Sequence, residues 1–295
     1  MAHREIALLN SSNLSSIAYE YNGDTMENIK VFRFKLSTAK LVPAALDRTR
    51  TTMSQINPIG ESPTKVMAKT NAATMEGNSG TGFYGIFYAN KQLFCSGKKI
   101  SSPYEASGSA VQADGRGIPH LIIKNDGTVK LRWFDGTSDL ARSYEACEVI
   151  IAGAHPLLVD GDSVFEVSKL SEGKRIANGS NLNDTSCRFN NSITEGSAGS
   201  PHARTMLGVS VRSGKAYEVF MVVTDGEAPM NIFTAAHLMQ DLGCNVAINL
   251  DGGSASQMRV ASGYTNNING ISPGRVTIIG SDSKTYGSAV CAVKR

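Results

Sequence analysis

Short apolar stretches separated by turn-forming residues dominate this sequence, and this rhythm most constrains its fold. Alternation of apolar and polar residues over four to eight positions predicts half-buried β-strands, whereas helical periodicity is scarce. The clearest stretches are "NIKVFRFKL" (28–36), "HLIIKNDGTVKLRWF" (120–134), "EVIIAGAHPLLVDGDSV" (148–164) and "RTMLGVSVRSGKAYEVFMVVTDG" (204–226).

Three of these stretches contain tight turns that predict β-hairpins. Each turn combines glycine with Asn, Asp or Ser, which tolerate the positive φ that such turns require. The turns are Asn125-Asp126-Gly127, Asp160-Gly161-Asp162 and Arg212-Ser213-Gly214-Lys215.

One helix is predicted in "NIFTAAHLMQDLG", with Asn231 as its N-cap and Gly243 as its left-handed stop. It separates a strand at 219–224 from a strand at 246–250. A short crossover of this kind favours a parallel pair of strands. The sequence therefore predicts an α+β fold: a mixed β-sheet core with few helices.

The chain has 295 residues, of which 41% are hydrophobic, enough for a sizeable core. We expect residues 61–295 to form the main domain and residues 1–60 to be a strand-rich segment packed on it. The longest loop is expected from Ser171 to Pro201, which is rich in Ser, Asn and Gly.

The net charge of +3 and the scattered basic residues do not suggest a nucleic-acid partner. Five widely spaced cysteines form no zinc pattern and are expected to be reduced, mostly buried thiols. No membrane span or ordinary secretion signal is apparent, which predicts a soluble, cytoplasmic or virion-associated protein. The oligomeric state is open.

Two Asp-Gly pairs follow the strands that flank the predicted helix. Asp225 precedes Gly226, and Asp251 begins "DGGSAS". If the strands are parallel, both carboxylates lie at one sheet edge, where ligands of open sheets bind. Gly252 and Gly253 would let a substrate approach the backbone, and Ser254 and Ser256 add hydroxyl groups. Each Asp-Gly pair could also be only a turn.

The segments "PHARTMLGVSVRSGKAYEVFMVVTDG" and "VAINLDGGSASQM", with the helix between them, resemble the phosphodiester glycosidase family. Upstream, "KVMAKTNAATM", "GTGFYGIFYANKQL" and "AGAHPLLVDGDSV" are similar to further family segments in the same order. The resemblance implies hydrolysis of the bond between a sugar anomeric carbon and a phosphodiester, of the N-acetylglucosamine-1-phosphodiester type, or of a related linkage. It implies a glycan or sugar-phosphodiester substrate and no organic cofactor.

Carried over by position, the resemblance implies site residues at Asn71, Arg204, Asp225, Asn249, Asp251, Gly252 and Gly253. The chain departs from the family pattern at Ala72, Ala73, Ser254 and Ala255, whereas Ser256 keeps a family serine. A nucleophilic serine at position 255 is therefore excluded.

The chemistry needs a cation for the phosphate and a carboxylate near the anomeric carbon. Arg204 fits the first role, and Asp251, or else Asp225, fits the second. His202 is a candidate acid for the leaving group, and Glu76 is either a third pocket carboxylate or a solvated loop acid. Asp225, Asp251 and nearby carbonyls could alternatively bind Ca²⁺.

A rival interpretation is a non-catalytic protein that binds carbohydrate or sugar phosphate on the same scaffold. The altered positions Ala72, Ala73 and Ser254 keep this interpretation open. A virion or cell-surface component is a third possibility, compatible with either of the others.

Overall fold

The computed structural model describes residues 13–46, 49–72, 85–95, 98–100, 119–133, 144–164, 200–265, 274 and 276–295. Glu76, Ala73 and nearly all of the expected long loop, up to residue 199, lie outside these ranges. Among the described residues, no helix is long and apolar enough to cross a membrane.

The largest sheet has seven strands in the order β1-β2-β15-β14-β16-β12-β13. Strands β1 and β2 come from the first 60 residues, and β2 pairs with β15 along six positions. The strands are β1 (Leu14–Tyr21), β2 (Asp24–Lys35), β12 (His155–Val159), β13 (Asp162–Ser163), β14 (Thr205–Arg212), β15 (Lys215–Val223) and β16 (Val246–Asn249).

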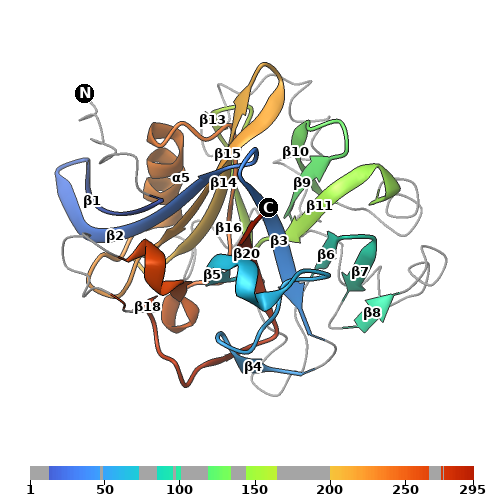
Figure 1. Cartoon of the computed structure of the whole chain (residues 1–295). Helices are drawn as coiled ribbons and strands as arrows, with labels where there is room; N and C mark the ends of the chain where they lie inside the picture. Colours follow the sequence, from blue (N-terminus) through green and yellow to red (C-terminus); the bar gives the residue numbers. More distant parts are fainter. Residues whose placement is uncertain are drawn as a thin grey trace.

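Two smaller sheets and a short strand pair complete the β-structure (Figure 1). The six-stranded sheet contains β10 (Val129–Trp133), β9 (Pro119–Lys124), β11 (Cys147–Ala152), β6 (Ile86–Ala89), β7 (Gln92–Cys95) and β8 (Lys98–Ile100), in that order. The five-stranded sheet contains β18 (Thr277–Ile279), β17 (Met258–Val260), β5 (Val66–Asn71), β20 (Ser288–Lys294) and β3 (Ala39–Ala45), in that order. Strands β19 (Thr285–Tyr286) and β4 (Thr51–Thr52) form the separate pair.

Helix α5 (Ile232–Asp241) is the one α-helix of the described ranges, and it confirms the helix expected from the sequence. The Asn231 side chain accepts a hydrogen bond from the Thr234 amide at 2.8 Å, and Gly243 has a φ of +83°. Short 3-10 turns lie at η1 (Pro63–Lys65), η3 (Tyr144–Ala146), η5 (Gly253–Ala255) and η6 (Ser262–Tyr264). A β-rich core with few helices is thus present.

All three predicted hairpins are confirmed. Strands β9 and β10, β12 and β13, and β14 and β15 are antiparallel pairs joined at the expected turns. Gly127, Gly161 and Gly214 have positive φ, as do the Asp160 and Ser213 that precede the last two. The turn residues therefore set the register of two strand pairs in the seven-stranded sheet and of one pair in the six-stranded sheet.

The expected side-by-side parallel pair is wrong in one respect. Strands β15 and β16 point the same way, but β14 lies between them and is antiparallel to both. The two-residue turn of the β14–β15 hairpin brings those strands together locally, which leaves the far edge of β14 for β16. Every strand pair in the described ranges is antiparallel, so a sheet of mixed direction is not found there.

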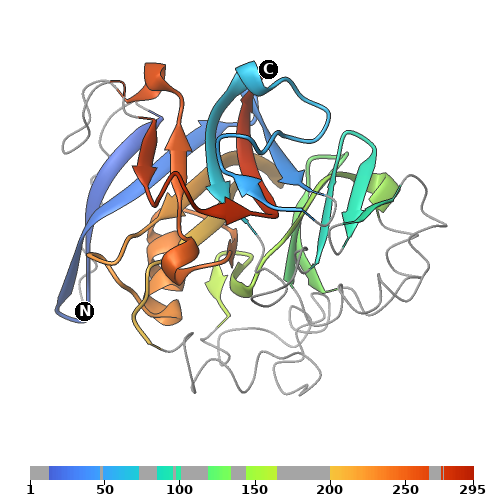
Figure 2. The same ribbon diagram turned by 90° about the horizontal axis from the view of Figure 1, so that it is seen from below.

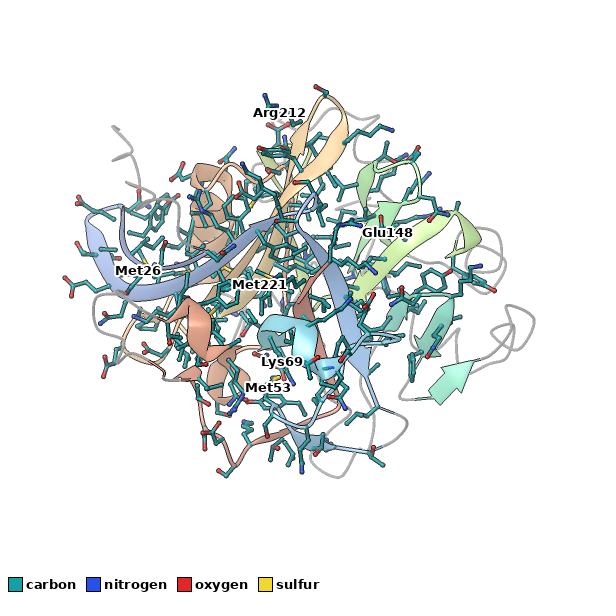
Figure 3. All side chains as sticks on the ribbon, in the orientation of Figure 1. Met26, Met53, Lys69, Glu148, Arg212 and Met221 are labelled. Atoms are coloured by element: carbon teal, nitrogen blue, oxygen red, sulfur yellow. The ribbon has the colours of Figure 1, made fainter. Side chains whose placement is uncertain are left out.

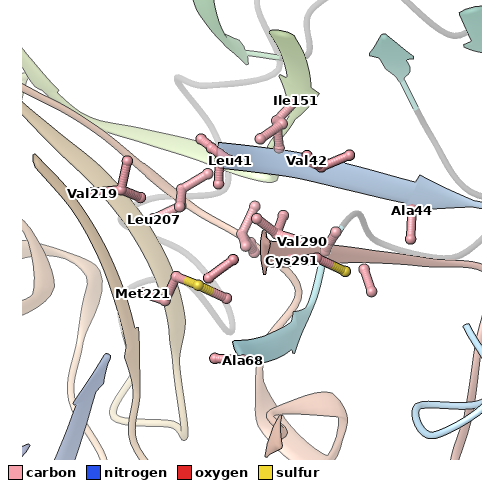
Figure 4. Close-up of a cluster of buried hydrophobic side chains, with 14 of the residues drawn as sticks. Leu41, Val42, Ala44, Ala68, Ile151, Leu207, Val219, Met221, Val290 and Cys291 are labelled. Carbon is pink, nitrogen blue, oxygen red and sulfur yellow. The ribbon is translucent and has the colours of Figure 1, made fainter. Parts of the chain in front are cut away.

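Both faces of the large sheet are buried. One face packs under α5, where Met206, Phe220 and Ala247 contact the apolar side of the helix. The other face contributes Leu207, Val219 and Met221 to the main core, together with side chains from β3 and β20 (Figure 4). Figure 3 shows Met221 deep in the molecule and Arg212 at the outer tip of the β14–β15 hairpin.

Buried polar groups in the core are few and mostly partnered. Lys69 is 9% exposed, and its Nζ donates to the carbonyls of Met53, Ser54 and Ile56 at 2.6–3.1 Å. Burial lowers the pKa of this ammonium. The described cysteines with placed side chains, Cys147, Cys244 and Cys291, are buried free thiols, as expected.

Gly208 of β14 allows α5 to approach the sheet. A Cβ at this position would lie 2.5 Å from both the Cys244 Sγ and the Met239 Cε. We therefore expect Gly208→Ala to lower the free energy of unfolding by about 1–3 kcal/mol, as overpacking does. Urea denaturation of wild type and variant measures this loss of stability. Gly263→Ala is the matched control, because nothing lies within 4 Å of its added methyl; equal effects at the two sites would contradict this packing argument.

Candidate active site

The ends of three strands meet at one edge of the large sheet. The Thr224 amide donates to the Arg204 carbonyl at 2.8 Å, and the Leu250 amide donates to the Thr205 carbonyl at 2.7 Å. Asp225 and Asp251 directly follow these two donors, so the two acids lie on either side of the segment that enters β14. Continuing the β14–β16 register places Arg204 opposite Asp251. The sequence-based expectation of a shared edge is met.

Asp251 is a partly buried acid with altered acidity. Burial raises the pKa of its carboxyl from the usual 3.8 to about 6. The Gly252 amide, which donates to Oδ1 at 3.0 Å, and the charge of Lys284 act in the opposite direction. A carboxyl that titrates near neutral pH is suited to proton transfer, and such groups concentrate at functional sites.

Asn71, at the end of β5, fastens the backbone of Asp251. Its Nδ2 donates to the Asp251 carbonyl at 2.8 Å, and its Oδ1 accepts from Thr205 Oγ1 and the Gln257 amide, both at 2.9 Å. The Asp251 amide donates to the Ala72 carbonyl at 2.8 Å. Asn71 is 1% exposed. Its amide group therefore links two sheets and fixes the loop that carries Asp251.

Gly252 and Gly253 make a loop that a side chain would disrupt. A Cβ on Gly252 would lie 2.8 Å from the Ala203 carbonyl oxygen, and Gly253 has a φ of +60° and donates to that same carbonyl at 2.7 Å. Ser254 is exposed, and its hydroxyl accepts from Lys284 Nζ at 2.7 Å. The loop is thus tied to β14 on one side and to residue 284 on the other.

Arg204 is 5% exposed, and burial lowers its pKa to about 10, so the guanidinium stays charged near neutral pH. Its Nε donates to the Met230 carbonyl at 2.9 Å, and its Nη2 donates to the Ser200 carbonyl at 3.0 Å. His202 pairs with Met230 through backbone hydrogen bonds of 2.9 and 3.2 Å. His202 and Arg204 therefore lie at the same edge, on a segment clamped to residue 230.

Asp225 uses its carboxylate within its own turn. Oδ1 accepts from the amides of Glu227 at 2.9 Å and Ala228 at 3.2 Å. Because β14 separates the strands that carry Asp225 and Asp251, their backbones are about 10 Å apart, twice the spacing of neighbouring strands. The two acids share an edge but have different surroundings.

Several buried polar atoms around Asp251 have no hydrogen-bond partner among the described residues. They are Asn249 Oδ1, His155 Nδ1, Ser256 Oγ and Tyr286 Oη. Unsatisfied buried polar groups are costly, so each of these atoms marks a place where water or a ligand can bind. Asn249 and Ser256 were expected as binding residues from the sequence.

His155 joins the site from β12, where it lies opposite Asn249. Burial, and then the charge of Arg204, lowers the pKa of His155 to about 4. The imidazole is therefore neutral near pH 7 and can donate or accept one hydrogen bond at each nitrogen. His155 was not among the catalytic or binding residues predicted from the sequence.

Lys284 and Tyr286 were missed by sequence reasoning. Both lie far along the chain from "DGGSAS", in a short polar segment without a recognisable motif. The negative charge of Asp251 adds to burial in raising the pKa of Tyr286, which places that phenol near the carboxylate. The pairings of β18 with β17, β19 with β4 and β20 with β5 bring the segment to the site, and no local sequence pattern indicates them.

Within the described ranges, no three His, Cys, Asp or Glu side chains lie close enough to hold a metal ion. The calcium site considered from the sequence would use two acids and backbone carbonyls, so it stays a prediction. Glu76 lies outside the described residues, so its place relative to the pocket stays a prediction.

The family model of the phosphodiester glycosidases matches residues 64–276, more than half of the chain. The chain belongs to the phosphodiester glycosidase family. The match includes both Asp-Gly pairs, Arg204 and Asn71, whereas Lys284 and Tyr286 lie beyond it.

Solved structures share the fold at low sequence identity. The catalytic domain of zebrafish N-acetylglucosamine-1-phosphodiester alpha-N-acetylglucosaminidase, auto-inhibited by its pro-peptide, superposes with a TM-score of 0.56 and 16% identity. That match covers 100% of this chain and 87% of the zebrafish chain. A hypothetical protein from Synechocystis gives a TM-score of 0.54 at 12% identity, covering 96% of this chain and 62% of the other. No curated protein sequence matches.

Asp251→Asn is expected to stabilise the folded protein at pH 7.5. The folded-state pKa lies above 3.8, so the folded protein holds this proton more tightly than the unfolded chain between pH 3.8 and about 6. Stability from this group is therefore present at low pH and lost as the pH rises through that window. Removing the charge should raise the free energy of unfolding by up to about 3 kcal/mol at pH 7.5.

Urea denaturation at pH 4.5 and 7.5 measures this gain, which should shrink at the lower pH. Asp24→Asn, at an exposed acid, is the matched control and should show no such pH dependence. A variant at position 251 that is less stable than wild type at pH 7.5 would count against a buried, destabilising carboxylate.

Proposed function

We propose that this family member hydrolyses the bond between a sugar anomeric carbon and a phosphodiester, with N-acetylglucosamine-1-phosphodiesters as the first substrates to test. The observation that carries the proposal is a partly buried carboxyl of raised pKa, Asp251, opposite a buried arginine at the edge shared by three strand ends. Family membership supports the reaction class.

The reaction matches the groups at this edge. Cleavage leaves positive charge at the anomeric carbon, while the phosphate departs with the bonding electrons as a phosphomonoester. Water supplies the hydroxyl that joins the sugar. A good leaving group needs little help from an acid, so the main demands are a carboxylate for the sugar and cations for the phosphate.

In this proposal Asp251 acts on the anomeric carbon in its ionised form, either as the base that activates water or as the nucleophile. Asn71 holds the loop of Asp251 in place, because its amide group is engaged by Asp251, Thr205 and Gln257. The unpartnered Asn249 Oδ1 and Ser256 Oγ, together with neutral His155, are suited to sugar hydroxyls. His202 and Asp225 remain candidates for handling the proton of the leaving group or of water.

Activity should be measured as reducing sugar released by the purified protein from a panel of sugar-1-phosphodiesters. We expect turnover by wild type and a loss of about 10²- to 10⁴-fold in kcat for Asp251→Asn, the usual range for a proton-transfer residue. Asp24→Asn should keep wild-type rates. Unchanged turnover in folded Asp251→Asn would remove this residue from the chemistry.

The pH profile reports the state of the same carboxyl. Because the pKa of Asp251 is raised to about 6 and the ionised form acts, kcat/KM should rise as the pH increases through about 6 and then level off. An ordinary aspartate would give this rise near pH 4. Measurements of kcat/KM from pH 4 to 9 test this expectation. A fall in kcat/KM above pH 6 would instead indicate that the protonated form of Asp251 acts.

Non-catalytic binding of a sugar phosphate is the second candidate. Ser254 and Ala255 depart from the family pattern. The Ser254 hydroxyl accepts a hydrogen bond from Lys284. Calorimetric binding of a sugar phosphate without product after prolonged incubation would favour this function.

A further inference from the structure

A turn from the end of the chain, residues 280–286, is packed against the loop that carries Asp251. Gly280 approaches so closely that a Cβ there would lie 2.8 Å from the Ser256 carbonyl oxygen. Gln257 Nε2 donates to the Ser281 carbonyl at 3.0 Å, and Lys284 Nζ donates to Ser254 Oγ at 2.7 Å. Three contacts thus join the turn to residues 254–257.

The far end of this turn is also anchored. Tyr286 is 3% exposed, and β19 pairs with β4. The loop after β4 is held by buried Lys69, whose Nζ donates to the carbonyls of Met53, Ser54 and Ile56. Lys284 therefore projects from a segment fixed at both ends, which lowers the entropy lost when its ammonium engages a ligand.

The charge of Lys284 is directed at the site. Its ammonium interacts electrostatically with Asp251. The nearby acid of the same turn, Asp282, is instead engaged by Arg259, which also donates to Thr277 at 2.7 Å. Ser256 and Tyr286 are both at least 96% buried, and Ser256 Oγ and Tyr286 Oη have no hydrogen-bond partner among the described residues. Ser256 lies on the Asp251 loop and Tyr286 on the turn, the two segments that Lys284 joins.

Arg204 alone is not well arranged for an anion, because its Nε and Nη2 donate to backbone carbonyls. A lysine ammonium has three donors, and one of them holds Ser254. We propose that Lys284, oriented by Ser254, is an anion-binding residue that takes the phosphate group of a sugar-phosphate ligand. This inference rests on the proposed function for the sugar part of the ligand. It adds to the site a second cation, Lys284, which lies outside the residues that match the family model.

Calorimetry with three probes tests the proposal: N-acetylglucosamine-1-phosphate, inorganic phosphate, and neutral N-acetylglucosamine. Lys284→Met should weaken binding of both phosphates by about 10- to 100-fold, the worth of a hydrogen bond to a charged group, and leave the neutral sugar unchanged. Lys284→Arg should retain most of the affinity. Ser254→Ala should produce a smaller loss, since the charge remains but its orientation is released.

Lys294→Met, at an exposed lysine of β20, is the matched control and should bind like wild type. The assignment would be overturned if Lys284→Met bound the sugar phosphate as tightly as wild type does. It would also be overturned if wild type bound no phosphate. Failure of the proposed hydrolysis is distinguishable, because the binding measurements need no turnover. If the protein binds phosphate through Lys284 but releases no sugar, the anion site is supported and the proposed hydrolysis is not.

Discussion

The candidate site depends on the hydrogen bonds of one buried amide. Asn71 connects the five-stranded sheet to the seven-stranded sheet by holding the Asp251 carbonyl, the Thr205 hydroxyl and the Gln257 amide. These groups lie on three different segments. A buried donor or acceptor left unpaired costs about 1–3 kcal/mol, so these bonds help to fix the position of Asp251.

The loop that carries Asp251 needs glycine at two positions, one because of a close contact and the other because of its backbone conformation. Gly252 passes beneath the Ala203 carbonyl, and Gly253 adopts a positive φ. The chain departs from the family pattern at the neighbouring positions 254 and 255 and keeps both of these glycines. Ala255 is buried, whereas Ser254 is exposed and contacts Lys284, so the departures alter the rim of the site and leave its backbone path intact.

Local features of the fold could be predicted because their causes are local. The cap at Asn231, the stop at Gly243 and the turns at Gly127 and Gly214 each act within a few residues. The position of β14 between β15 and β16 could not be predicted from the crossover rule, because a hairpin formed earlier in the chain occupies the intervening place. The shared edge of Arg204 and Asp251 was predictable from strand direction and the family pattern. Lys284 and Tyr286 were not, since pairings between strands distant in the sequence bring them there.

Strand β20 occupies an inner position of the five-stranded sheet, between β3 and β5 (Figure 2). Its partners lie more than two hundred residues earlier in the sequence, and both pair with β20 rather than with each other. On the ribosome, the edges of β3 and β5 that pair with β20 must therefore stay open until residues 288–294 have emerged. Such edges invite pairing with other chains, so the interval before β20 arrives is the time when this protein depends most on protection from aggregation.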